Sequence, residues 1–163
     1  MFPHAMADQV VLEHPNRDKS SSKATRSIVV LLLLVSAFLL ALVAAGGWDF
    51  LQGAKGPHIA YILIYLVFAY FVVRWNRGVL PVIAAFAIIL AIFAAISGLA
   101  WFDRDKVGFD QPPIDSGVLG LICWLIVPVQ VLLIAFCAQG FAQAWHVEVE
   151  RHRPTGQAVP AAG

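Results

Sequence analysis

Four long stretches of the chain contain no charged residue, and each of them is almost entirely apolar. They cover residues 27–47, 59–73, 79–102 and 117–145. A helix needs about 20 apolar residues to cross about 30 Å of hydrocarbon, so the first, third and fourth stretches are long enough. The second reaches this length if Pro57 and His58 begin its helix among the headgroups and Arg74 extends its guanidinium to the opposite interface. The pattern predicts an all-α fold, an integral membrane four-helix bundle with spans at about 27–47, 57–75, 79–102 and 117–145.

The composition also indicates a membrane protein. Hydrophobic residues make up 60% of the 163 residues and charged residues 13%, against about 45–50% and about 25% in soluble domains. The mean hydropathy is +0.79. A formal net charge of +1 provides no basic face for a nucleic acid, so nucleic-acid binding is excluded.

The charged residues and the tryptophans predict the orientation. If the N-terminus is cytoplasmic, eight of the eleven Lys and Arg residues lie on the cytoplasmic side, where cations concentrate. Tryptophan rings favour the headgroup layer, and one tryptophan closes each span as an interface anchor: Trp48, Trp75, Trp101 and Trp145. We expect a multi-pass protein of a plasma (inner) membrane with both termini cytoplasmic (N-in/C-in). The compact loops and short tails favour a bacterial source.

The connections suggest how the chain is divided. A five-residue link at 74–78 joins the second and third spans, so these two helices are expected to form a tight antiparallel hairpin. A flexible cytoplasmic N-tail (1–26) precedes the four-helix transmembrane domain (27–152), and a flexible C-tail (153–163) follows it. Met6 is a possible alternative start. The small residues at 44–46 also fit a signal-peptide cleavage site, which would leave three helices.

Small residues recur along the third span. Ala87, Ala91 and Ala95 are spaced by four residues, and Gly98 follows them. Such a stripe lets two helices approach closely, and close packing holds helices together in lipid. The stripe serves either internal packing of the bundle or a homo-oligomer contact.

The fourth span contains a proline and three glutamines. Pro128 removes the amide partner of the Trp124 carbonyl and predicts a helix kink. An amide in hydrocarbon needs a partner, so Gln130, Gln139 and Gln143 are expected to face protein, either within the bundle or on a partner subunit. The alternative is that they line a polar path for a substrate.

Aromatic residues form one face of the second span. Tyr61, Tyr65, Phe68 and Val72 recur at helical spacing. This face either binds a quinone, lipid or pigment or places its hydroxyls against headgroups and neighbouring helices.

Several kinds of chemistry are not supported by the sequence. No Asp, Glu, Lys, Arg or His falls inside an uncharged stretch, whereas proton- and ion-coupled transporters use an ionisable group at mid-membrane. His58 and His146 lie at opposite ends of the predicted bundle, which disfavours bis-histidine haem. Cys123 and Cys137 are about 21 Å apart along one helix, too far for a disulfide. No cofactor, metal or catalytic residue is predicted, although structural lipid is expected.

The loop between the third and fourth spans is acidic. Its aspartates are Asp103, Asp105, Asp110 and Asp115. A calcium loop is disfavoured because Val107 and Ile114 stand where oxygen ligands belong. We expect this loop to contact an extracytoplasmic part of another subunit.

These features together favour a small non-enzymatic membrane protein. The main hypothesis is an accessory or scaffold subunit of a larger membrane protein complex, whose partners are membrane lipids and either that complex or further copies of the chain. The alternative is a small oligomeric permease or lipid-handling protein with a polar path along the fourth helix.

Overall fold

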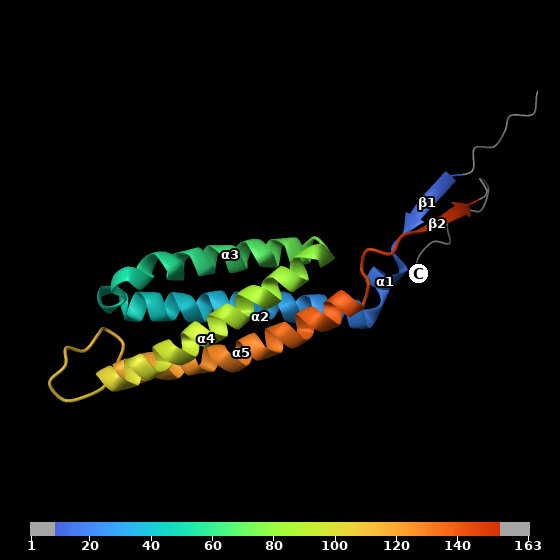
Figure 1. Cartoon of the computed structure of the whole chain (residues 1–163). Coiled ribbons are helices and arrows are strands. Elements are labelled where there is room, and N and C mark those ends of the chain that lie inside the picture. The colour runs from blue at the N-terminus through green and yellow to red at the C-terminus, as the bar shows by residue number, and fades with distance from the viewer. Residues whose placement is uncertain (1–8, 154–163) are drawn as a thin grey trace, which may run out of the picture.

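The computed structural model describes residues 9–153 and is predominantly helical (Figure 1). Its helices and strands are β1 (Gln9–Glu13), α1 (Pro15–Asp18), α2 (Ser20–Gly46), α3 (Lys55–Val73), α4 (Leu80–Arg104), α5 (Ser116–Ala142) and β2 (Val149–Arg153). Four of the described helices are long and apolar enough to cross a membrane. They are α2, α3, α4 and α5, which correspond to the four predicted spans.

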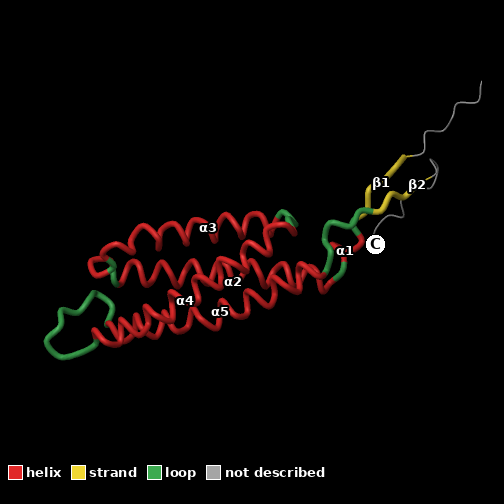
Figure 2. Tube along the Cα trace, viewed as in Figure 1, coloured by secondary structure: helices red, strands yellow, loops and turns green. Residues whose placement is uncertain are grey.

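The four long helices run side by side in an elongated bundle (Figures 1 and 2). We call the end that carries β1, α1, β2 and the short α3–α4 connection the terminal end. The opposite end, with the 47–54 and 105–115 connections, is the loop end. α4 packs along α5, and α2 contacts both α3 and α5. α3 and α4 diverge from their connection towards the loop end (Figure 1).

The buried face of α4 repeats every three or four residues. It consists of Leu80, Ile83, Ala87, Leu90, Ala94, Gly98 and Trp101. α5 presents a similar seam, which includes Leu119, Cys123, Ile126, Gln130, Leu133, Cys137 and Gly140. This spacing is that of side chains interdigitating between nearly parallel helix axes. The core lies between α4 and α5 and is completed by α2 and by the buried residues of α3.

Small residues are needed where helices cross closely. A Cβ atom on Gly98 would lie 2.4 Å from Cδ1 of Trp124 and 3.3 Å from the carbonyl oxygen of Gly120. At the end of α2, a Cβ atom on Gly46 would lie 2.6 Å from Ile114. Of the small residues at 44–46, which also fit a cleavage site, Ala44 and Gly46 are buried and therefore have a packing role.

The N-terminal segment differs from the expected flexible tail. Within residues 9–26 the structure forms β1, α1 and the first turns of α2, which begins at Ser20 rather than at 27. The hydroxyl of Thr25 donates to the Ser21 carbonyl oxygen at 2.9 Å, which shows the helix continuing through the polar sequence. β1 pairs antiparallel with β2. Met6 and residues 154–163 of the expected C-tail lie outside the described residues.

Two helices end earlier than predicted. α3 ends at Val73 rather than at 75, and α5 ends at Ala142 rather than at 145. Trp75 and Ala144 have φ values of 60° and 49°, and this left-handed backbone cannot continue an α-helix. At the predicted kink α5 runs through Pro128 without interruption, and the proline is exposed on the outward face.

Candidate functional site

Gln130 lies at the centre of a buried polar network. The Tyr65 hydroxyl donates to Oε1 of Gln130 at 2.9 Å, and Nε2 of Gln130 donates to Oγ of Ser36 at 2.9 Å. Ser36 donates in turn to the carbonyl oxygen of Leu32 at 2.7 Å. All three side chains are fully buried. The network therefore joins α2, α3 and α5 within one chain.

Gln143 belongs to a second network, at the terminal end. Its Nε2 donates to Oγ1 of Thr25 at 3.0 Å, and its Oε1 accepts from Nε1 of Trp145 at 3.0 Å. The Trp145 ring meets the Trp75 ring edge-on, with centroids 5.2 Å apart. Trp145 is completely buried, so its ring packs inside the bundle and closes the terminal end.

Gln139 is placed differently from the other two glutamines. It was expected to face protein, but its side chain is exposed and has no hydrogen bond within residues 9–153. The physical reason is the position of the buried seam of α5, which runs through Cys137 and Gly140. Each residue turns the helix by about 100°, so Gln139 points away from this seam. The structure does not bring the three glutamines together.

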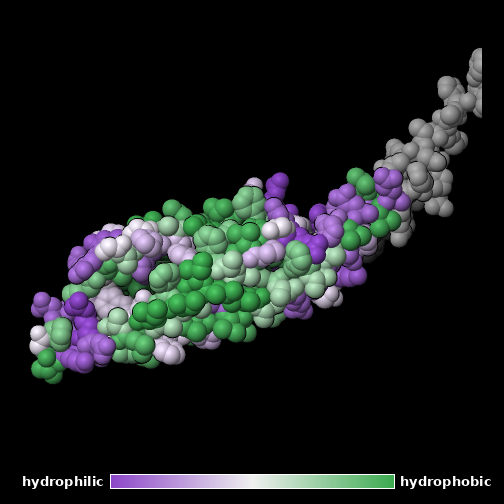
Figure 3. Space-filling model, viewed as in Figure 1, coloured by the Kyte–Doolittle hydropathy of each residue, from purple (hydrophilic) through white to green (hydrophobic). Residues whose placement is uncertain are grey.

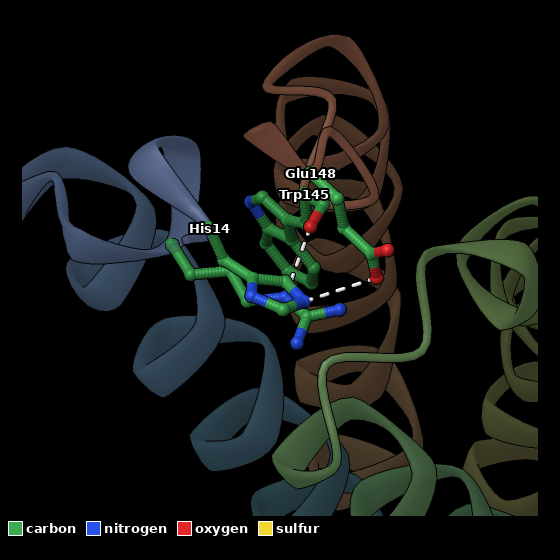
Figure 4. A network of polar contacts seen from close by, with 4 residues as sticks. His14, Trp145 and Glu148 are labelled. Atoms are coloured by element: carbon green, nitrogen blue, oxygen red, sulfur yellow. Dashed lines mark hydrogen bonds and ion pairs between the residues drawn. The ribbon is translucent and has the colours of Figure 1, made fainter. Parts of the chain in front are cut away.

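The segments on either side of the bundle are tied to each other at the terminal end. Nε of Arg17 donates to the Trp145 carbonyl oxygen at 2.9 Å, and Nδ2 of Asn16 donates to that of Ala144 at 3.1 Å. The His14 ring faces the Glu148 carboxylate beside Trp145, at 3.1 Å (Figure 4). Segments about 130 residues apart in the chain are thereby joined outside the spans.

Arginine side chains cover the same end of the bundle. Nε of Arg77 donates to the Phe141 carbonyl oxygen at 2.8 Å, and its guanidinium lies 3.9 Å above the Phe141 ring. The Arg26 guanidinium lies 4.3 Å above the Trp75 ring. Arginine is suited to this position because its planar guanidinium stacks on rings and binds carbonyls while remaining charged.

The alanine stripe of α4 is divided between two environments. Ala87 and Gly98 are buried in the seam against α5, whereas Ala91 and Ala95 are half-buried at its edge. The intervening seam position is Ala94, which the four-residue spacing missed. A repeat of alternating three and four residues would have identified it.

The aspartates of the 105–115 connection and its borders have separate structural roles. Asp115 caps α5, where its Oδ1 accepts from the backbone amides of Gly117 and Val118. Oδ1 of Asp103 lies 3.3 Å from Nζ of Lys106, and Asp105 and Asp110 are exposed. Within residues 9–153 no group of three or more His, Cys, Asp or Glu side chains is placed to hold a metal ion.

The other predicted anchors also differ in exposure. Trp101 is buried and packs against Gly47 at the loop end. Trp48 is 42% exposed, and Nζ of Lys55 lies 4.7 Å from its ring. Sequence reasoning missed Ser36, Thr25 and Asn16 as partners. Ser36 alone carried a signal, as an isolated hydroxyl within the first span.

Comparison with known proteins identifies no relative. No protein-family model matches the chain, and no curated protein or solved structure is detectably similar to it. The comparisons therefore assign neither a fold family nor an activity to this chain.

Proposed function

We propose that this chain is a small non-enzymatic subunit of a bacterial plasma membrane that acts through contacts within the bilayer, as an accessory or scaffold component of a larger membrane protein complex. The four uncharged stretches contain no Asp, Glu, Lys, Arg or His, which removes the usual groups for relaying charge through lipid. The buried amide of Gln130 is occupied by Ser36 and Tyr65. These features favour a rigid packing unit.

The exposed amide of Gln139 carries the proposal. Its neighbours on the same outward face of α5 are Ala135, Ala138 and Ala142, all exposed. Alanines allow another helix to come close, and an amide in hydrocarbon is stabilised by a hydrogen bond from that helix. We call these four residues the Gln139 face. It is the surface on which we expect the partner subunit to pack.

The orientation proposed for the chain is N-in/C-in. The terminal end carries Arg17, Arg26, Arg74 and Arg77 together with Lys19 and Lys23. Cations near the ends of spans favour the cytoplasmic side, so the terminal end is assigned to the cytoplasm. The Gln139 face then lies in the cytoplasmic half of the bilayer.

The permease alternative has less support. A polar path along α5 requires several of its glutamines to share one surface, but Gln130 is fully buried, Gln143 bonds within the terminal end, and Gln139 faces outward. Within the described chain these positions do not form a continuous path.

Site-specific photocross-linking in intact membranes tests the proposal. A benzoylphenylalanine replaces Ala138 on the Gln139 face or, as a matched control, Ala85, which is exposed on the outward face of α4. We expect one discrete product between Ala138 and a different polypeptide, little product from Ala85, and loss of the Ala138 product in Gln139→Leu.

Other outcomes would contradict the accessory role. A product only of twice the mass of the chain would assign the face to a homo-oligomer. Equal products at Ala138 and Ala85 would remove the specificity of the face. Solute transport by the purified chain in liposomes would favour the permease.

A further inference from the structure

A cavity of about 210 Å³ lies between α3 and α4 at the loop end. α2 and α5 form its floor, because Leu40, Val43, Cys123 and Ile126 line it together with residues of α3 and α4. Figure 3 shows the molecule from this side, with the hollow between the two diverging helices. It is separate from the Gln139 face, which lies at the terminal end.

The cavity results from the way α3 packs. The described residues of α3 that precede Tyr65 are all exposed or half-buried, whereas Tyr65, Phe68, Ala69 and Val72 are buried. Since α3 and α4 diverge from their connection, the loop-end half of α3 does not close against α4. The space between them is left open.

Three residues that line the cavity carry polar groups without a partner within residues 9–153. Nδ1 of His58 donates to the Ala54 carbonyl oxygen at 2.9 Å, and its Nε2 makes no hydrogen bond. The hydroxyls of Tyr61 and Ser97 make no hydrogen bond within this range. Ser36, in contrast, bonds the carbonyl four residues earlier in its helix. The lining of the cavity therefore includes polar groups that are available to an occupant.

The floor of the cavity is apolar. Leu40, Leu90 and Ile126 are buried and line it, and no Asp, Glu, Lys or Arg is among the described residues that line the cavity. Water does not fill apolar cavities, and a cavity of about 150 Å³ already accepts a benzene-sized hydrocarbon. The space is therefore suited to an apolar chain.

The depth of these polar groups in the bilayer indicates which part of a lipid they could meet. His58 and Tyr61 are in the first two turns of α3, and Ser97 is about 10 Å from the end of α4 by helical rise. The headgroup layer is about 5–7 Å thick on each side of the hydrocarbon. The three groups are thus near the boundary of these layers, where the ester carbonyls of a glycerolipid lie.

We propose that the cavity is a binding site for one acyl chain of a membrane glycerolipid. The chain lies against Leu90 and Ile126, and its ester carbonyl accepts from Tyr61 or Ser97. The site goes beyond the accessory role, because it needs no partner subunit. No charged side chain of the described lining reaches a headgroup, so the site recognises the chain and ester.

Native mass spectrometry of the full chain, purified in mild detergent, tests the site. The probes are dioleoylphosphatidylglycerol and dioleoylphosphatidylethanolamine, with glycerophosphoglycerol as the chain-free control and duroquinone, a quinone ring without an alkyl tail, as the competitor. We expect one diacyl lipid per chain with either headgroup, no binding of glycerophosphoglycerol, and no displacement by duroquinone.

Two sets of variants locate the bound lipid. Ala94→Phe fills the cavity and should lower lipid retention more than tenfold, whereas Ala85→Phe, on the outward face of the same helix, should leave it unchanged. Tyr61→Phe combined with Ser97→Ala keeps the shape of the site and should lower retention about tenfold, since the hydrogen bond to the ester carbonyl is lost whichever hydroxyl donates it.

The following results would overturn the site. They are absence of a retained lipid in the native chain, equal retention in Ala94→Phe and Ala85→Phe, retention unchanged in the Tyr61→Phe, Ser97→Ala variant, or displacement of the lipid by duroquinone. The conservative double variant gives a result even if Ala94→Phe does not fold.

Discussion

The terminal end and the loop end join the same four apolar helices but are packed differently. At the terminal end α3 is buried through Tyr65, Phe68 and Val72, and the Trp75 and Trp145 rings close the bundle. Among the described buried side chains, Ser22 Oγ alone lacks a hydrogen bond. At the loop end the first ten residues of α3 are not buried, and the cavity remains between α3 and α4.

The difference shows that hydrophobicity does not specify packing in a membrane chain. Lipid is as apolar as leucine, so the burial of one more apolar side chain gains little, and shape and hydrogen bonds decide where helices meet. The terminal end has aromatic pairs and amide bonds that hold α3 against its neighbours. At the loop end, the Tyr61 hydroxyl of α3 makes no hydrogen bond within the described chain, and the His58 ring bonds only the nearby Ala54 carbonyl oxygen.

The largest expected effect comes from removing the tryptophan that closes the terminal end. Trp145→Ala should lower the free energy of unfolding by about 3–5 kcal/mol, because a fully buried ring leaves a cavity. Trp48→Ala at the loop end, where the ring is 42% exposed, is the control and should cost under about 1 kcal/mol. Reversible unfolding in mixed micelles measures both, and equal losses would abolish the contrast between the ends.

Substitutions at two alanines on one face of α4 test the difference in packing between the two ends. Ala87 is fully buried in the closed part of α4, and Ala94, two turns further along the same face, lines the cavity. Ala87→Leu overpacks a filled core and should destabilise the delipidated protein by about 1–3 kcal/mol. Ala94→Leu places its methyl groups in open space and should change stability by under about 0.5 kcal/mol. A larger loss for Ala94→Leu in the same unfolding assay would show that the cavity closes in solution.

Replacing the buried Gln130 amide should have a smaller effect on the free energy of unfolding. Gln130→Leu leaves the Tyr65 hydroxyl without its acceptor, which should cost about 1–2 kcal/mol. The triple variant Ser36→Ala, Tyr65→Phe, Gln130→Leu should recover most of the lost free energy of unfolding. Three apolar side chains of similar shape need no hydrogen bonds. Additive losses in a mutant cycle would mean that the three side chains are not one network.

The smallest effect is expected outside the spans. His14→Ala removes the hydrogen bond to the Glu148 carboxylate at the terminal end, which is partly exposed, and should cost under about 1 kcal/mol. Lys106→Ala, which removes the exposed Asp103 ion pair at the loop end, should cost as little. The Lys106→Ala loss should fade at high salt. If His14→Ala lowered the free energy of unfolding by several kcal/mol, the contact between the two terminal segments would stabilise the fold more than its exposure indicates.

Much of the fold could be predicted without coordinates. The uncharged stretches located all four long helices, because the hydrocarbon tolerates few charges and its thickness sets the helix length. The ends of the helices were less predictable. Trp75 and Ala144 adopt left-handed backbone angles that no nearby proline or glycine announces, and α2 extends into a polar sequence that resembled a tail.

From the order of amino acids alone it follows that the chain is helical and suited to cross a membrane four times, because these properties depend on composition and on the length of each apolar stretch. Which polar groups meet depends on the folded arrangement. Gln130, Gln139 and Gln143 are chemically identical, yet one is bonded at the core, one faces outward, and one bonds Trp145. Their environments depend on helix rotation and on the divergence of α3 from α4, which are set by contacts between residues far apart in the sequence.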